Sequence, residues 1–174
     1  AATSPYTVDK DGHGPAWANS LFEDNAEHGL GMYYGQQAIR ERLIAKLEEM
    51  AAADATPAET KDAIAKFMET KDNGAANAEP AKALVAQLEK GAAAGCDACK
   101  EVLQHKEYLA KKSVWIFGGD GWAYDIGFGG LDHVLASGQD VNVMVFDTEV
   151  YSNTGGQASK ATNIGAVAQF AASG

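Results

Sequence analysis

Two polar, glycine-rich segments contain residue types that can hold a metal ion and phosphates together. One is Gly118-Gly119-Asp120-Gly121, the other runs from Thr148 to Asn153, and each follows an apolar run. Glycine lets the backbone approach a bulky anion closely. A carboxylate such as that of Asp120 can face phosphates when a hard cation lies between them, and Mg²⁺ shares its oxygen ligands with phosphates. The two segments therefore predict a Mg²⁺–diphosphate site, to which the second segment adds hydroxyl, carbonyl and amide oxygens.

The elements that would position these segments form a simple pattern. The apolar runs Val114–Phe117 and Val141–Phe146 predict two buried strands. Apolar residues at helical spacing predict a helix from Tyr124 to Ser137, which Gly138 would stop. A strand, a helix and a strand in this order predict a βαβ unit with parallel strands and a right-handed crossover. Both polar segments then lie at the carboxyl ends of strands, where open α/β sheets bind ligands.

The polar segments also resemble a known cofactor motif. Gly119-Asp120-Gly121, followed after 26 residues by the polar oxygen ligand Thr148, resembles the thiamine diphosphate motif. That motif is usually written GDG, a gap of this order and then Asn-Asn, whereas Asp147-Thr148 stands here in place of Asn-Asn. Residues 118–127 and 147–157 look like the version found in pyruvate:ferredoxin (or flavodoxin) oxidoreductases.

The resemblance covers roughly residues 4–33 and 113–174 and is loose between them. It implies an α/β fold, namely a parallel-sheet thiamine-diphosphate-binding domain with a helical insertion at about residues 35–112. The sequence begins without methionine and stops just after an apparent helix over residues 163–172. We therefore expect residues 1–174 to be one partial domain, truncated at both ends, of a long multidomain chain.

The resemblance further implies an oxidoreductase that oxidatively decarboxylates pyruvate to acetyl-CoA and CO₂. Electrons would pass through iron–sulfur clusters to ferredoxin or flavodoxin. The segment would bind thiamine diphosphate and Mg²⁺, whereas the ligands of the [4Fe-4S] clusters would lie elsewhere in the parent chain. Expected partners are pyruvate, coenzyme A, ferredoxin or flavodoxin, the remaining domains of the parent chain and a second copy in a homodimer. The fragment alone would be inactive.

Individual site residues follow from the same resemblance. Asp120 and Thr148 would bind Mg²⁺ through their side chains, and Val150 through its carbonyl. Asn153 and Phe22 would lie at the reacting end of the cofactor, the amide bonded to the substrate-derived oxygen and the ring beside the thiazolium. The whole expected cofactor-binding set comprises Gly119, Asp120, Gly121, Trp122, Thr148, Glu149, Val150, Tyr151, Ser152 and Asn153.

The rest of the chain predicts helices. One begins near Trp17, and a clearer pattern of apolar residues among charged ones covers Gln36–Ala52. Thr56-Pro57-Ala58-Glu59 predicts a capping box that opens a helix to about Glu69. After an alanine-rich spacer, Pro80 would open another helix that ends at Gly91, and a last helix would run from about Asp97 to Lys111.

Cys96-Asp-Ala-Cys99 has the spacing of a metal half-site or a redox pair. A zinc site usually takes four ligands, and the sequence contains no second CxxC. We therefore interpret the two cysteines as small residues on a helix.

Composition excludes some classes of function. The formal net charge of −10 disfavours nucleic acid as a partner, since phosphate backbones attract basic surfaces. No apolar run is long enough to span a bilayer, and two cysteines fit a reducing cytoplasm better than a secreted disulfide scaffold. Three alternatives stay open: a related 2-oxoacid:ferredoxin oxidoreductase with another substrate, a non-catalytic cofactor-binding or assembly module, and a generic nucleotide-binding fold.

Overall fold

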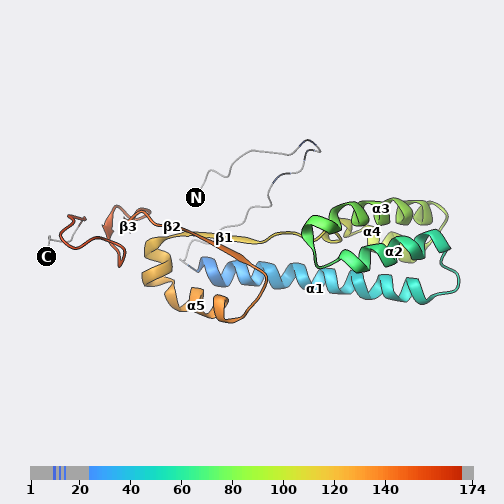
Figure 1. Cartoon of the computed structure of the whole chain (residues 1–174), viewed down its shortest axis with the longest axis horizontal. Coiled ribbons are helices and arrows are strands. Elements are labelled where there is room, and N and C mark those ends of the chain that lie inside the picture. The colour runs from blue at the N-terminus through green and yellow to red at the C-terminus, as the bar shows by residue number, and fades with distance from the viewer. Residues whose placement is uncertain (1–9, 11, 13, 15–23, 170–174) are drawn as a thin grey trace. The chain divides into compact units, whose positions relative to one another are not determined.

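The computed structural model describes residues 10, 12, 14 and 24–169, which fall into two compact units (Figure 1). Unit 1 comprises Val114–Gly174 and Ala1–Gly31, as far as these are described, and unit 2 comprises Met32–Ser113. Helix α1 (Asn25–Ala52) contributes its first turns to unit 1 and the remainder to unit 2. Every residue of the predicted diphosphate site therefore belongs to unit 1.

Unit 2 is entirely helical over the residues that are described. Besides most of α1 it contains α2 (Ala58–Thr70), α3 (Gly74–Ala93), α4 (Asp97–Leu103) and the short 3₁₀ helix η1 (Lys106–Tyr108). Its core takes apolar residues from every one of the four α-helices and one from the end of η1, namely Leu43, Leu47, Met50, Ile64, Phe67, Ala81, Leu84, Leu88, Cys99, Val102 and Leu109. The helical nature predicted for this part of the chain is thus confirmed.

Two predicted helix boundaries and one predicted cap in unit 2 are wrong. Helix α3 begins at Gly74 rather than at Pro80, because the Asn73 side chain caps it and the alanine-rich spacer has high helix propensity. Pro57 is the N-cap of α2 without any side-chain cap bond, so the predicted capping box does not form. Helix α4 ends at Leu103, well before Lys111, and η1 follows it.

The interpretation of the two cysteines is also wrong. Cys96 precedes α4 as its N-cap, and its sulfur is joined to that of Cys99 in a disulfide. The spacing of three residues brings the cap position and the first turn of a helix onto the same side, so the two sulfurs meet.

Unit 1 contains the predicted βαβ pattern. Strands β1 (Trp115–Gly119) and β2 (Asn142–Phe146) are parallel, with Trp115 opposite Asn142 and Gly119 opposite Phe146. Strand β1 continues through two glycines that we assigned to a turn. The predicted single helix is instead a π-helix, η2 (Gly121–Ile126), followed by α5 (Phe128–Ala136). Gly138 follows α5 with a φ of 65°, the left-handed conformation that ends helices, as predicted.

The first turns of α1 pack against β1. A Cβ added to Gly29 would lie 2.5 Å from Cγ1 of Ile116, so only glycine allows this approach. Helix α1 runs without interruption through Gly29 and Gly31, although glycine weakens a helix. The start of the helix predicted near Trp17 lies outside the described residues.

After β2 the chain forms a small hairpin rather than a helix. Strands β3 (Val150–Tyr151) and β4 (Gln157–Ala158) are antiparallel. The helix predicted over residues 163–172 is wrong for its described part, residues 163–169, which contains a turn and a bridge between Gln157 and Gln169. Gly165, with a φ of 86°, breaks the helical conformation there.

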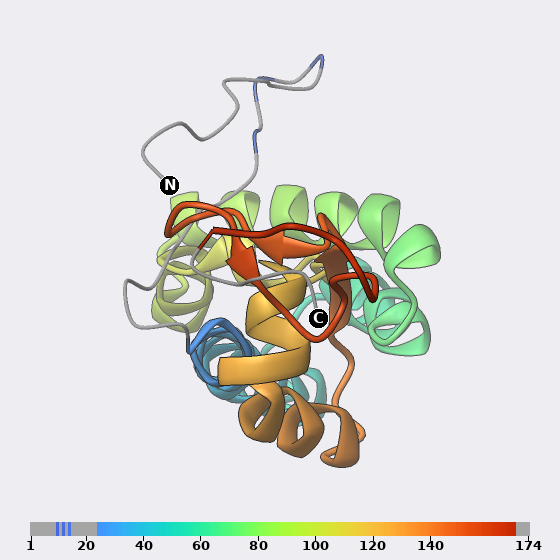
Figure 2. The same cartoon turned by 90° about the vertical axis from the view of Figure 1, so that its left-hand side faces the viewer.

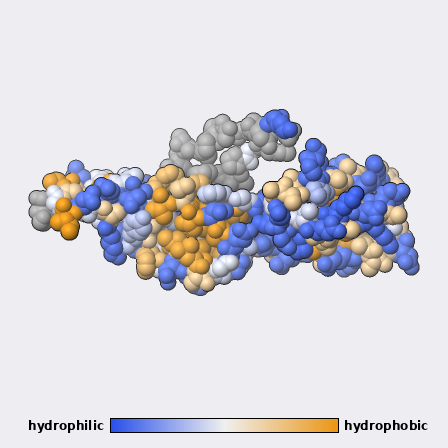
Figure 3. Space-filling view, viewed as in Figure 1, coloured by the Kyte–Doolittle hydropathy of each residue, from blue (hydrophilic) through white to orange (hydrophobic). Residues whose placement is uncertain are grey.

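Unit 1 exposes several large apolar side chains. Figure 3 shows hydrophobic residues gathered over η2 and α5, where Ile126, Phe128 and Leu135 are more than half exposed. On one face of the sheet, Phe117 stacks on the ring of Phe146 with 5.9 Å between ring centroids, and both rings remain exposed. Parallel sheets are usually covered on both faces. Among the described helices, none is long and apolar enough to cross a membrane.

We predict that Phe67→Ala lowers the free energy of unfolding by about 3–5 kcal/mol, because Phe67 has no exposed area and its removal leaves a cavity in the unit 2 core. The neighbouring exposed Lys66→Ala serves as control and should change the free energy by less than about 0.5 kcal/mol. Urea unfolding followed by circular dichroism measures both. Equal effects of the two substitutions would contradict this assignment of the core.

Candidate functional site

Asp120 lies at the carboxyl end of β1, directly before η2, and its carboxylate has no exposed area. A buried carboxylate requires donors for its oxygens. The Thr148 backbone N–H and hydroxyl donate to Oδ1 at 3.0 and 3.1 Å, and the Ser159 hydroxyl donates to Oδ2. The parallel pairing of β1 with β2 brings Thr148 beside Asp120, since both residues follow the ends of adjacent strands. The carboxylate therefore joins three segments of the chain.

These contacts set the charge of Asp120. Burial raises the pKa of the carboxyl group, but the hydrogen bonds from the Ser159 hydroxyl and from the Thr148 N–H and hydroxyl outweigh burial. The pKa is therefore held below its usual value, and Asp120 is an anion at neutral pH.

The Thr148 hydroxyl is the meeting point of several oxygens. Its Oγ1 lies 3.1 Å from Asp120 Oδ1, 3.2 Å from the Val150 carbonyl oxygen and 2.6 Å from Ser152 Oγ. A carboxylate and a carbonyl can only accept, while each hydroxyl has one proton to donate. The four oxygens therefore hold two protons between them, and one of the four carries a negative charge. Hard cations bind such sets, and Mg²⁺ commonly takes one or two carboxylates together with phosphates and water. The residues present fit Mg²⁺.

Glu149 gives the turn after β2 its unusual backbone. Its φ of 61° lies in the left-handed region, which costs a residue other than glycine about 1–3 kcal/mol. The segment that follows β4 compensates for this cost. Thr162 Oγ1 donates to the Glu149 carbonyl at 2.5 Å, and the Asn163 amide donates to the Glu149 carboxylate at 3.1 Å. Such conformations persist where surrounding contacts fix them, often at functional sites.

Glycines allow η2 to pack closely around the site. A Cβ on Gly121 would lie 2.6 Å from the Tyr151 ring, so this glycine lets the hairpin approach η2. The Trp122 indole is wedged between Gly118 and Gly127, is 3% exposed, and has no partner for its Nε1 among the described residues. The Trp122 side chain therefore supports the fold, and its backbone N–H is the group it can offer to a ligand. π-Helices of this kind are frequent at functional sites.

Sequence reasoning missed the third segment of the site, residues 159–163. Besides the bond from Ser159 to Asp120, the Lys160 backbone N–H donates to Asp125 Oδ2 and the Lys160 ammonium donates to the Tyr124 carbonyl, both at 3.0 Å. Figure 2 shows this red segment beside the orange helix η2. The only signal in the sequence was a run of polar residues after Gly155-Gly156, part of which we assigned to the start of a helix.

The remaining predicted site residues are placed as follows. Gly119 is the last residue of β1, next to Asp120. Ser152 and Asn153 are exposed in the turn between β3 and β4, and no hydrogen bond joins the Asn153 side chain to any described residue. Phe22 lies outside the described residues. The structure thus brings together Asp120, Thr148, Val150 and Ser152.

A family model matches the part of the chain that contains the three segments of this site. The sequence model of the family described as "Thiamine pyrophosphate enzyme, C-terminal TPP binding domain" matches residues 86–172. Thiamine pyrophosphate is the same compound as thiamine diphosphate. The match includes the ends of both β1 and β2 as well as residues 159–163, so it covers all three segments that meet at Asp120.

Several longer proteins are similar to the chain over nearly its whole length. Identity is 54% to a pyruvate-flavodoxin oxidoreductase of Klebsiella pneumoniae and 51% to a pyruvate:ferredoxin oxidoreductase of Moorella thermoacetica, each over 100% of this chain and 15% of the relative. Identity to a probable pyruvate-flavodoxin oxidoreductase of Escherichia coli is 49%, over 97% of this chain and 13% of the relative. The chain thus spans about one seventh of these relatives.

We predict that Ser159→Ala makes the stability of unit 1 less dependent on pH. The lowered pKa of Asp120 contributes stability that is present above the ordinary aspartate pKa of about 3.9 and is lost as the pH falls through the lowered value. Without the Ser159 donor the pKa of Asp120 rises, so Ser159→Ala is most destabilising near neutral pH, and the difference from the parent shrinks below about pH 4. Urea unfolding at several pH values measures this.

Ser137→Ala is the matched control. The Ser137 hydroxyl donates a hydrogen bond to the Val134 carbonyl at 2.6 Å, and it contacts no carboxylate in the described structure. Its effect should be independent of pH. A pH-independent loss of stability in Ser159→Ala as well would contradict the role assigned to the Ser159–Asp120 bond.

Proposed function

Because the chain belongs to the family of C-terminal TPP-binding domains of thiamine pyrophosphate enzymes, we propose that its site binds the diphosphate of thiamine pyrophosphate through Mg²⁺. One observation carries this proposal. Three oxygen-bearing groups converge at the ends of two parallel strands: the anionic Asp120 carboxylate, the Thr148 hydroxyl and the Val150 carbonyl. Their oxygens can accept more hydrogen bonds than the single Thr148 proton can supply.

Each residue has a distinct part in this binding. Asp120 contributes the negative charge that a divalent cation requires, and Thr148 and Val150 contribute neutral oxygens. The first N–H groups of a helix have no partners within it and favour anions, so the amides of Gly121 and Trp122 at the start of η2 are suited to phosphate oxygens. Gly119 and the turn from Glu149 to Asn153 line the site of the same diphosphate.

The contacts of Thr148 would let its oxygen hold a cation. A lone pair of this oxygen would then serve the cation, and the hydroxyl proton would need another acceptor. The proton can then be donated to Ser152 Oγ, which lies 2.6 Å away. Ser152 therefore keeps the Thr148 hydroxyl oriented for the metal, and Ser159 keeps Asp120 ionised.

Bound thiamine pyrophosphate supplies a carbon nucleophile for the carbonyl of a 2-oxo acid. Asn153 is proposed to donate its amide to the oxygen that gains negative charge, and Phe22 to pack beside the reacting ring. The Asn153 side chain is exposed and free of bonds to described residues, so it can turn toward a ligand. Such a donor acts more strongly on the transition state than on the ground state.

Within a longer protein, the segment is proposed to serve the oxidative decarboxylation of pyruvate to acetyl-CoA and CO₂. The names of the relatives support pyruvate as substrate and flavodoxin or ferredoxin as acceptor. Coenzyme A, iron–sulfur clusters with ligands outside this chain, a homodimer and a cytoplasmic location belong to the same proposal. Exposed apolar residues such as Phe117, Phe146 and Ile126 support packing of unit 1 against further parts of such a protein. Unit 2 is proposed to be a helical insertion.

We predict that Asp120→Asn weakens the binding of thiamine pyrophosphate in the presence of Mg²⁺ by on the order of 10-fold or more, because the cation loses its charged ligand. The fold should survive, since an asparagine oxygen can still accept from Thr148 while its NH₂ group donates to Ser159 Oγ. Calorimetric titration of the protein that carries this segment measures the affinity, and thermal melting checks the fold.

The exposed Asp132→Asn in α5 controls for loss of a surface charge and should bind normally. Titration with ATP and Mg²⁺ tests the alternative of a generic nucleotide-binding fold. Unchanged thiamine pyrophosphate affinity in Asp120→Asn, or tighter binding of ATP than of thiamine pyrophosphate, would rule out the proposed site.

We predict that Asn153→Ala lowers kcat of the intact enzyme by on the order of 10²-fold, as expected for loss of one donor to a developing oxyanion. The affinity for thiamine pyrophosphate should change little, because the contacts to Mg²⁺ and diphosphate remain. If Asn153 only braced its turn, stability and cofactor affinity would fall together and the cofactor-saturated variant would turn over normally. Steady-state kinetics with cofactor titrated to saturation separates the two results.

A further inference from the structure

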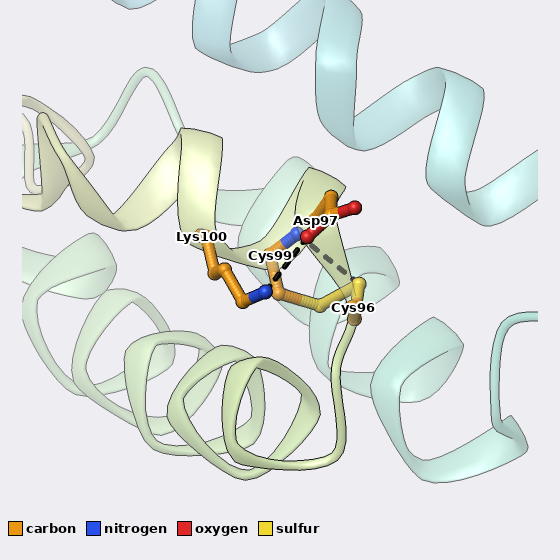
Figure 4. The surroundings of a disulfide bond; sticks show 4 residues. All are labelled: Cys96, Asp97, Cys99 and Lys100. Carbon is orange, nitrogen blue, oxygen red and sulfur yellow. Dashed lines mark hydrogen bonds and ion pairs between the residues drawn. A yellow bond between two sulfur atoms is a disulfide. The ribbon is translucent and has the colours of Figure 1, made fainter.

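The disulfide between Cys96 and Cys99 joins the residue that caps α4 to the first turn of the same helix (Figure 4). The two Cα atoms are 5.3 Å apart, within the usual range for a disulfide. A bond across only three residues holds no distant segments together. Its presence in unit 2 therefore calls for an explanation other than bracing the fold.

The two sulfurs differ in access. Cys96 is partly exposed, whereas Cys99 is 3% exposed and belongs to the core of unit 2. An external thiolate can attack only a sulfur that it can reach, and the other sulfur then leaves. Cys96 is therefore the sulfur that exchanges with a partner, and Cys99 is the sulfur that leaves and later re-forms the bond.

The surroundings favour the thiolate of Cys96 after the bond opens. The Cys99 backbone N–H donates to Cys96 Sγ at 3.1 Å, and a donor at the start of a helix stabilises a thiolate. Lys100 is paired with Asp97 at 2.7 Å on the exposed side (Figure 4). The hydrogen bond from the Cys99 N–H needs only the Cys96 sulfur as acceptor, so we expect it to persist when the disulfide is reduced.

Helix α3 is shaped to admit the pair. A Cβ on Gly91 would lie 2.6 Å from Cys99 Sγ, so only a glycine at this position leaves room for the sulfur. The Gly91 carbonyl accepts from the Cys96 N–H at 3.0 Å, and Gly95 turns the chain between the two helices with a φ of 97°. The end of α3 thus fixes the backbone of Cys96 independently of the disulfide.

We propose that Cys96 and Cys99 form a reversible dithiol–disulfide site that exchanges two electrons with dithiol reductants. This inference is independent of the proposed cofactor site in unit 1. A metal site at the two cysteines is disfavoured, because among the described residues no group of three His, Cys, Asp or Glu side chains includes them.

The exchange proceeds in two balanced steps. A thiolate of the reductant attacks Cys96 Sγ, a mixed disulfide forms, and the Cys99 thiolate leaves and takes up a proton. The second thiolate of the reductant then attacks the reductant sulfur that is bonded to Cys96. This attack releases the Cys96 thiolate, which also takes up a proton. The reductant ends as a disulfide that has lost two electrons and two protons, and the protein has gained both.

We predict that the chain, equilibrated in mixtures of reduced and oxidised dithiothreitol and quenched with acid, shows a single two-electron transition in which both thiols appear together. Labelling with a polyethylene-glycol maleimide under denaturing conditions counts the thiols by gel shift. No denaturant should be needed for reduction, and circular dichroism should remain the same before and after. Three results would each overturn the proposal. They are two free thiols at every ratio of reduced to oxidised dithiothreitol, a disulfide that forms only between two chains, and reduction that occurs only in denaturant.

Two single variants test the assigned roles. Each variant keeps one thiol: Cys99→Ser retains Cys96, and Cys96→Ser retains Cys99. Iodoacetamide should alkylate Cys96 on the order of 10-fold faster than Cys99, because Cys96 is accessible and its sulfur accepts a backbone hydrogen bond. Thermal melting controls for folding of both variants. Gly91→Ala should impair formation of the disulfide, whereas Ala94→Ser, in the adjoining turn, should not. Equal alkylation rates in the two single-cysteine variants would contradict the roles assigned to them.

Discussion

The burial of one carboxylate governs the arrangement of unit 1. Asp120 has no exposed area, and a buried anion without donors would cost more free energy than a small unit can supply. The donors come from Thr148 and Ser159, which are 28 and 39 residues away in the sequence. Satisfying this anion therefore fixes the turn after β2 and the segment after β4 against the end of β1. The same contacts place the oxygens that suit Mg²⁺.

Close packing of backbone is the second requirement of the site. Gly121 makes room for Tyr151, and the Trp122 indole fills the space between two further glycines. The left-handed conformation of Glu149 is held by the segment that also supplies Ser159. A site assembled this way has its oxygens positioned before any ligand arrives, which reduces the reorganisation that binding requires. In unit 2, Gly91 similarly admits the sulfur of Cys99.

Local patterns in the sequence predict part of this structure. The two apolar runs and the helical spacing between them indicate the parallel pair, and Asp120 and Thr148 follow from their places after strands. Ser159 could not be found in this way, because its bond to Asp120 spans 39 residues and leaves no periodic signal. The start of α3 was misplaced because a proline usually marks the first turn of a helix, whereas Pro80 lies inside α3 despite the lost hydrogen bond and the clash of its ring, and the helix begins after the cap at Asn73. The disulfide was missed because the lack of further ligands argues against a zinc site but not against a bond between two cysteines, which needs no further partner.

The central claim is that Asp120, Thr148 and Val150 hold the cation that anchors a diphosphate. A crystal structure of the protein with thiamine pyrophosphate and Mn²⁺ in place of Mg²⁺, with the metal located by its anomalous scattering, tests this claim most directly. We expect one peak bonded to an oxygen of Asp120, to Thr148 Oγ1 and to the Val150 carbonyl, at about 2.0–2.2 Å as for small divalent cations. A metal bound elsewhere, or a Thr148 hydroxyl still donating to Asp120 in the presence of bound cofactor, would contradict it.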